Sequence, residues 1–183
     1  MTLALSTSSP LVSVALFDES GQLVRSAEET APRAASGTVI RLALALLGEA
    51  GLSSVSRLVV DAGPGSFTGV KVGLAVAKSW SYALGVPVAP VTSFDLIGVG
   101  GAVALPSKKG EHFYRSAVGE VSVVSGPLPE GTASGDFPRA LHAGVHLNDL
   151  VYGDEMSLSG FYVAEPSISQ AKQAHIMGET FGV

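Results

Sequence analysis

The chain has 183 residues, of which 46% are hydrophobic and 15% charged, with no cysteine and a formal net charge of −5. This composition is typical of a globular α/β protein with a sizeable core, and it excludes disulfides, thiolate nucleophiles and cysteine-ligated metals. The acidic balance argues against a broad nucleic-acid-binding face, which needs clustered Lys and Arg. The apolar start lacks a basic segment, and no run reaches about 18 apolar residues. We therefore expect no signal peptide, no membrane span and a cytoplasmic location.

The first hundred residues predict strands and helices in the order βββαβαβ. In chain order, the expected elements are strands at 3–6, 11–17 and 23–30, a helix at about 34–50, a strand at 58–61, a helix at about 66–84 and a strand at 86–91. This order predicts the ribonuclease-H-like arrangement, a mixed sheet of about five strands with helices packed on it.

The second part of the chain is less regular. The segments AVALP, HFYRSAVG and VSVVSG predict three more strands, and a loop rich in Gly, Pro and Ser follows over 126–138. A shift in composition near 98–101 predicts a lobe boundary. We therefore expect an N-terminal lobe over 1–100 and a smaller, irregular and shortened C-terminal lobe over 101–183.

The turn DAGPGSFTG at 61–69 joins a predicted strand to a predicted helix. It does not have the spacing of a Walker A loop, of GxGxxG or of a GxSxG elbow. Glycine N–H groups and a helix N-terminus still favour anions, so Gly63, Gly65 and Ser66 are weak candidate phosphate or nucleotide contacts. The favoured interpretation is structural, with two glycines shaping a tight turn and Ser66 capping the helix.

Small residues lie four apart on the helix after this turn, at Gly69, Gly73, Ala77 and Ser81. Glycine inside a helix costs about 1 kcal/mol relative to alanine, so a close backbone approach should offset it. The stripe packs either against the protein's own sheet or first helix, or against a partner's helices, and the sequence leaves both open. The first helix carries apolar stripes on Ile40, Leu44 and Leu47 and on Val39, Ala43 and Leu46.

No catalytic or metal-binding set emerges from the sequence. His142 and His146 have an i,i+4 spacing but lack the glutamate of HExxH. Adjacent acidic pairs such as Glu28 and Glu29 point in different directions on regular structure, so they are poor candidates for paired acid/base work.

The stretches LALSTSSPLVSVALF and DAGPGSFTGVKVGLAVAKSWSYALGVPVAPVTSFDLI resemble the TsaB family, also called YeaZ, over about the first hundred residues. The resemblance implies an actin-like ATPase fold of two ribonuclease-H-like lobes. It also implies a non-catalytic partner of the transferase TsaD in threonylcarbamoyladenosine modification of tRNA next to the anticodon. Implied partners are TsaD, a TsaE-like ATPase and a second copy of the chain. The resemblance implies that tRNA is contacted only through the complex. We expect no cofactor of its own, and ATP or ADP at the complex interface.

The chain departs from the transferase TsaD and also from the usual pattern of the TsaB family. Where TsaD has metal-binding histidines, this chain reads Thr92-Ser93-Phe94-Asp95 and Ala34-Ala35-Ser36-Gly37. Where the family usually has Asp-Thr in the first phosphate turn, it has Ser6-Thr7, which are further weak candidates for phosphate contact. Since serine cannot supply the acidic charge that organises magnesium and phosphate, independent ATP hydrolysis is not expected.

The sequence therefore predicts a scaffold rather than an enzyme. The predicted partner interface comprises Ile40, Leu44, Leu47, Gly69, Val70, Gly73, Leu74, Ala77 and Ser81. Replacing Gly73 by leucine is expected to abolish partner binding and leave the fold largely intact. The alternatives are a nucleotide-binding kinase or ATPase of the actin-like superfamily and a peptidase-like paralogue.

Overall fold

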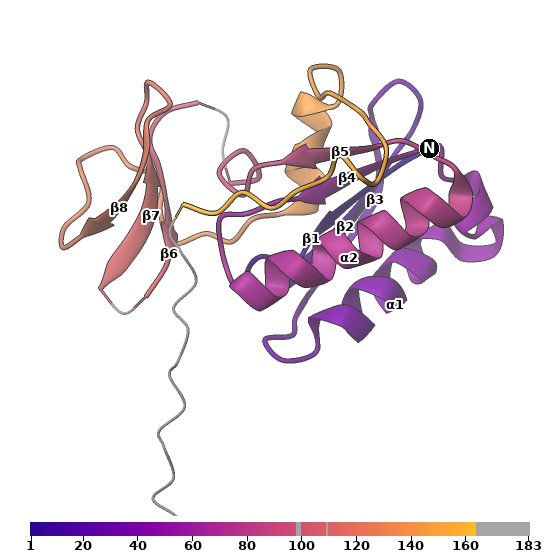
Figure 1. Ribbon diagram of the computed structural model, residues 1–183, viewed down its shortest axis with the longest axis horizontal. Coiled ribbons are helices and arrows are strands. Elements are labelled where there is room, and N and C mark those ends of the chain that lie inside the picture. The colour runs from indigo at the N-terminus through magenta and orange to yellow at the C-terminus, as the bar shows by residue number, and fades with distance from the viewer. Residues whose placement is uncertain (98–99, 109, 164–183) are drawn as a thin grey trace, which may run out of the picture.

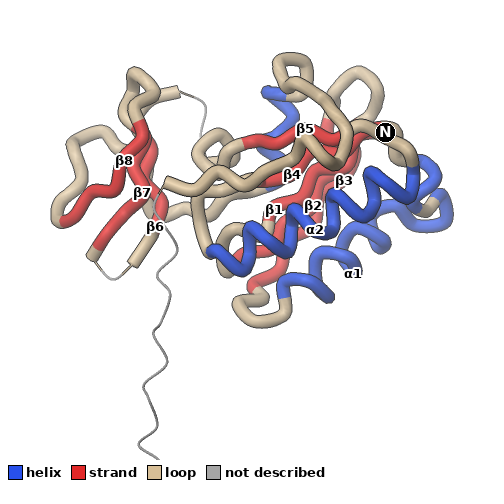
Figure 2. Tube along the Cα trace, viewed as in Figure 1, coloured by secondary structure: helices blue, strands red, loops and turns tan. Residues whose placement is uncertain are grey.

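The computed structural model describes residues 1–97, 100–108 and 110–163. The chain forms a five-stranded sheet, a three-stranded sheet and the helices α1 and α2. Figures 1 and 2 show both helices along one face of the larger sheet and the smaller sheet beyond the strand ends. The first part contains β1 (Thr2–Ser6), β2 (Leu11–Phe17), β3 (Leu23–Thr30), α1 (Ala35–Leu47), η1 (Gly48–Ala50), η2 (Leu52–Ser54), β4 (Arg57–Asp61), α2 (Phe67–Leu84) and β5 (Val88–Val91). The predicted order βββαβαβ and the mixed five-stranded sheet are confirmed.

The five-stranded sheet has the order β3-β2-β1-β4-β5. β1, β2 and β3 form an antiparallel meander, while β4 pairs parallel with β1 and with β5. Helices α1 and α2 make the crossovers that parallel pairing requires. The carboxyl ends of β1, β4 and β5 consequently meet at one edge, which is where ligands bind in open α/β sheets.

Both faces of the central strands β1, β2 and β4 are buried, and the alternation of side chains explains how. Leu3 and Leu5 of β1 pack in the cluster under α1 and α2, whereas Ala4 between them packs in a second cluster on the opposite face. A short 3₁₀ helix, η3 (Ala140–His146), covers that opposite face. Residues 140–147, which follow the three-stranded sheet in the chain, thus contribute to the core of the first sheet.

Glycines set the ends of both helices. α1 ends at Leu47, three residues before the predicted end, because its C-cap Gly48 has a positive φ of 55°. α2 ends at Leu84, as predicted, with Gly85 in the left-handed region at a φ of 65°. No helix in the described ranges is long and apolar enough to cross a membrane.

The second sheet contains the three further strands that the sequence predicts. They are β6 (Val103–Pro106), β7 (Glu111–Arg115) and β8 (Val121–Ser125), all antiparallel. After β8 the chain returns to the first sheet, where Gly153 makes an antiparallel bridge with Val88 of β5. The lobe boundary proposed near 98–101 stays a prediction, since residues 98–99 lie outside the described ranges.

Candidate functional site

A buried carboxylate lies at the strand edge where ligands would be expected. Asp61 ends β4 with no exposed surface, and four groups donate hydrogen bonds to it. The Oγ atoms of Ser6, Ser8 and Ser93 lie 2.6, 2.5 and 2.5 Å from its oxygens, and the backbone N–H of Gly63 lies 2.9 Å away. Three strand ends and the glycine turn are therefore joined through one side chain.

The electrostatics of Asp61 favour a structural role. Burial raises the pKa of its carboxyl group, and the hydrogen bonds from the three serines and Gly63 partly oppose that rise. Both oxygens are occupied within the chain, so neither faces a substrate. Across the part of the chain that the structure describes, no group of three or more His, Asp or Glu side chains is placed to hold a metal ion.

The glycine turn after Asp61 is packed against the β1–β2 connection. Ser66 donates its N–H to the carbonyl oxygen of Ser8 at 2.7 Å, and its side chain accepts a hydrogen bond from the N–H of Gly69 at the start of α2. A Cβ added at Gly65 would lie 2.4 Å from that same Ser8 oxygen. Glycine is therefore needed at 65 by contact within the chain, and the expected cap by Ser66 is present.

The small-residue stripe of α2 faces the protein's own sheet. A Cβ at Gly69 would lie 2.1 Å from the carbonyl oxygen of Thr7, and one at Gly73 would lie 2.6 Å from Thr7 Oγ1. Thr7 Oγ1 also donates a hydrogen bond to the Gly69 carbonyl at 2.7 Å. Of the two readings left open by the sequence, the structure thus supports close approach to the protein's own sheet.

This packing corrects most of the predicted partner interface. Seven of its nine residues are buried inside the chain itself, namely Leu47, Gly69, Val70, Gly73, Leu74, Ala77 and Ser81. Only Ile40 and Leu44 are exposed, at 39% and 45%. The expectation that Gly73→Leu would spare the fold is also corrected, because a leucine there would collide with Thr7 and Val60.

The candidate phosphate contacts also divide into residues buried inside the chain and residues that line a cavity. Ser6, Thr7 and Gly63 are buried, and their polar groups bind Asp61 or Gly69. Ser6 and Gly63 are therefore not available to a phosphate, and that prediction is corrected for them, whereas Thr7 also lines a small cavity with Ser66 and Gly69. Gly65 and Ser66 instead line a cavity between the first sheet and the three-stranded sheet.

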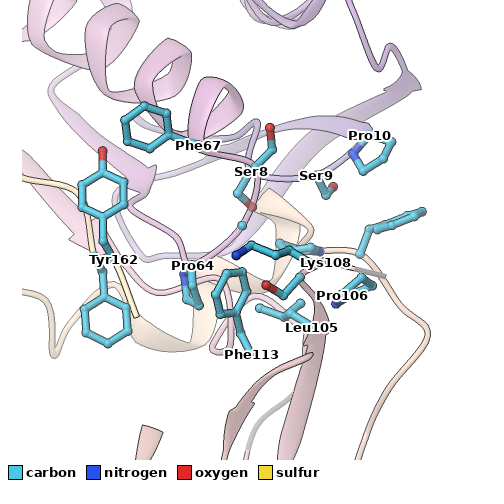
Figure 3. A pocket seen from close by; sticks show the side chains of 16 residues that line it. Ser8, Ser9, Pro10, Pro64, Phe67, Leu105, Pro106, Lys108, Phe113 and Tyr162 are labelled. Carbon is cyan, nitrogen blue, oxygen red and sulfur yellow. The ribbon is translucent and has the colours of Figure 1, made fainter. Parts of the chain in front are cut away.

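This cavity has a volume of about 610 Å³. Figure 3 shows Phe67, Phe113 and Tyr162 around it, with Lys108 reaching in beside Ser8 and Pro64. Its aromatic residues come from α2, from β7 and from the segments around 137 and 161, so no local motif in the sequence marks them. Sequence reasoning missed this feature for that reason.

The three-stranded sheet is held to the first by a partly buried ion pair. Arg115 of β7 donates to Asp95 Oδ1, and Thr92 Oγ1 donates to Asp95 Oδ2 at 2.6 Å. Burial raises the pKa of Asp95, but the hydrogen bonds from Thr92 and Arg115 outweigh it and hold that pKa below its usual value. A ring nitrogen of His142 lies 2.7 Å from the Leu96 carbonyl oxygen, so this histidine supports the same segment.

Parts of this chain are similar in sequence to known proteins. The family model for TsaD, tRNA N6-adenosine threonylcarbamoyltransferase, matches residues 28–108. The TsaB protein of Bacillus subtilis, a tRNA threonylcarbamoyladenosine biosynthesis protein, is 38% identical over 47 residues, covering 26% of this chain and 20% of its own length. An uncharacterized protein of Mycobacterium tuberculosis is 35% identical over 99 residues, covering 52% of this chain and 47% of its own length.

A solved structure agrees in fold. It is a Pseudomonas aeruginosa protein described as similar to the peptidase YeaZ, with a TM-score of 0.75, 23% identity, and coverage of 89% of this chain and 99% of its own. The sequence matches show that the chain is similar to proteins of threonylcarbamoyladenosine biosynthesis, TsaD and TsaB, and the solved structure shows that it shares the fold of YeaZ. The chain spans about half the length of the mycobacterial relative and less of the TsaB protein.

Proposed function

We propose that this chain is a non-catalytic subunit that binds a TsaD-type transferase and supports threonylcarbamoyladenosine modification of tRNA. The observation that carries the proposal is that Asp61, at the carboxyl end of β4, is fully buried. Its oxygens accept four hydrogen bonds from within the chain, so the groups that an actin-like enzyme would offer to magnesium and phosphate are used for packing. The TsaB/YeaZ resemblance supplies the biological process.

The exposed face of α1 is the proposed contact with the transferase. Ile40 and Leu44 lie four residues apart and therefore project from the same side of the helix. Their neighbours on the helix, Val39 and Ala43, are fully buried against the sheet. Two exposed apolar side chains on a helix whose opposite face is already buried favour the docking of another helix.

The remaining parts of the proposal follow the family resemblance. A TsaE-like ATPase would join the complex, and ATP or ADP would bind at the complex interface rather than to this chain alone. A second copy of the chain would compete for α1 when the transferase is absent. The protein would act in the cytoplasm and meet tRNA only through the complex.

Binding to the transferase tests the α1 surface. We expect the double variant Ile40→Asp, Leu44→Asp to bind a cognate TsaD-type subunit at least about tenfold more weakly, because a charge would be buried without a partner. Isothermal calorimetry measures the affinity, and circular dichroism checks that the fold is kept.

Val118 provides a matched control, since it is apolar and 84% exposed but lies in the β7–β8 turn. The Val118→Asp variant should bind the transferase like the wild type. Undiminished binding by the double α1 variant would show that the transferase docks elsewhere.

A further inference from the structure

The cavity between the two sheets has walls suited to a flat apolar ligand. Five aromatic residues and four prolines line it, together with four serines, Leu105, Gly65 and Lys108. The aromatic residues are Phe67, Phe113, Phe137, Phe161 and Tyr162. The rings of Phe67 and Tyr162 lie 5.6 Å apart at an interplanar angle of 53°, so they form one tilted wall. Aromatic and proline walls with a few hydroxyl groups are typical of small-molecule sites of this volume.

The side chains at the cavity mouth are partly open to solvent. Phe67 is 39% and Tyr162 46% exposed, although both are large apolar groups whose burial would be favourable. A second layer of contacts holds this wall in place, because Lys71 Nζ lies 3.9 Å from the Phe67 ring centroid and Phe161 N–H donates to the Ala62 carbonyl oxygen at 2.7 Å. These contacts within the chain fix the position of the wall.

The charge in the cavity is opposite to that of the chain as a whole. The chain carries a net charge of −5, yet the described residues that line the cavity include Lys108 and no Asp or Glu. Asp61 lies behind Ser8, fully buried and hydrogen-bonded, so its carboxylate is not part of the wall. The N-terminal end of α2 also borders the cavity at Ser66 and Phe67 and favours negative charge.

We propose that this cavity binds a small planar aromatic carboxylate, with its ring between Phe67, Phe113 and Tyr162 and its anionic group toward Lys108. A single lysine matches a single negative charge. A magnesium-bound triphosphate would need several cations and acidic metal ligands, which the described lining does not provide. The site is independent of the α1 surface, so it stands or falls separately from the proposed function.

Binding of 2-naphthoate to the full-length chain tests the proposal. In ¹H–¹⁵N correlation spectra, 2-naphthoate should shift the amides of Gly65, Phe67 and Ser107 and saturate with a Kd on the order of 1 mM or tighter. Its neutral analogue 2-naphthamide should bind about fivefold more weakly, because it lacks the charge that Lys108 attracts.

Two variants and their matched controls locate the ligand. Lys108→Gln and Tyr162→Ala should each weaken 2-naphthoate binding about fivefold, whereas Lys78→Gln and Tyr82→Ala, on α2 away from the cavity, should not. Equal binding of naphthoate and naphthamide would overturn the proposal, as would shifts confined to other residues. Tighter binding of ATP–Mg²⁺ than of 2-naphthoate at the same amides would overturn it in favour of a nucleotide site.

Discussion

Replacing Asp61 by alanine is expected to lower the free energy of unfolding by about 4 kcal/mol. The substitution leaves the hydroxyl groups of Ser6, Ser8 and Ser93 and the N–H of Gly63 without their shared acceptor. Each buried polar group that loses its partner costs about 1–3 kcal/mol, and reorientation of the hydroxyls recovers part of this. Urea unfolding followed by circular dichroism at pH 7 measures the loss.

Two further variants make the Asp61 test specific. Asp61→Asn keeps the size of the side chain and one acceptor oxygen, so about 2 kcal/mol should be lost. Asp149→Ala, at an exposed position, should change stability by no more than about 0.5 kcal/mol. An Asp61→Ala protein as stable as the wild type would mean that Asp61 does not hold the strand ends together.

Replacing Gly69 by alanine is expected to lower the free energy of unfolding by about 3 kcal/mol. The added Cβ would lie 2.1 Å from the carbonyl oxygen of Thr7. Because that atom belongs to the backbone of the β1–β2 connection, the helix and the sheet would have to separate, and overpacking of this kind costs about 1–3 kcal/mol or more. Thermal and urea unfolding both report the change.

Gly37 of α1 is the matched control, since an added Cβ there meets nothing within 4 Å. Gly37→Ala should therefore raise the free energy of unfolding by up to about 1 kcal/mol through helix propensity alone. The same glycine-to-alanine change is therefore expected to lower the free energy of unfolding in α2 and to raise it in α1. Stabilisation by Gly69→Ala would contradict the close approach of α2 to the β1–β2 connection.

The sequence predicts the five-stranded sheet and its two helices well because their signals are local. Apolar runs mark β1, β2 and β4, and the cap at Ser66 and the C-cap at Gly85 mark the ends of α2. Helical spacing alone gives two stripes on α1, one through Val39 and one through Ile40, and does not say which is buried. The sheet decides this, since α1 rests on β2 through the Val39 side.

The candidate site could not be predicted because it is assembled from distant segments. Ser6, Asp61 and Ser93 come from the ends of three strands, so their convergence depends on strand order. The small-residue stripe is ambiguous for a related reason. Its close contact, Thr7, lies 62 residues before Gly69 in the chain, and glycine spacing is the same whether the neighbour is the protein's own backbone or a partner's.

Reconstitution of tRNA modification tests the central claim most directly. A TsaD-type transferase, a TsaE-type ATPase, threonylcarbamoyl donor and tRNA are combined with this chain, and threonylcarbamoyladenosine is measured by mass spectrometry. We predict that the wild-type chain restores the modified base, that the Ile40→Asp, Leu44→Asp variant does not, and that the chain alone turns over no ATP. Full modification without this chain, or ATP hydrolysis by the chain alone, would contradict its role as a non-catalytic subunit.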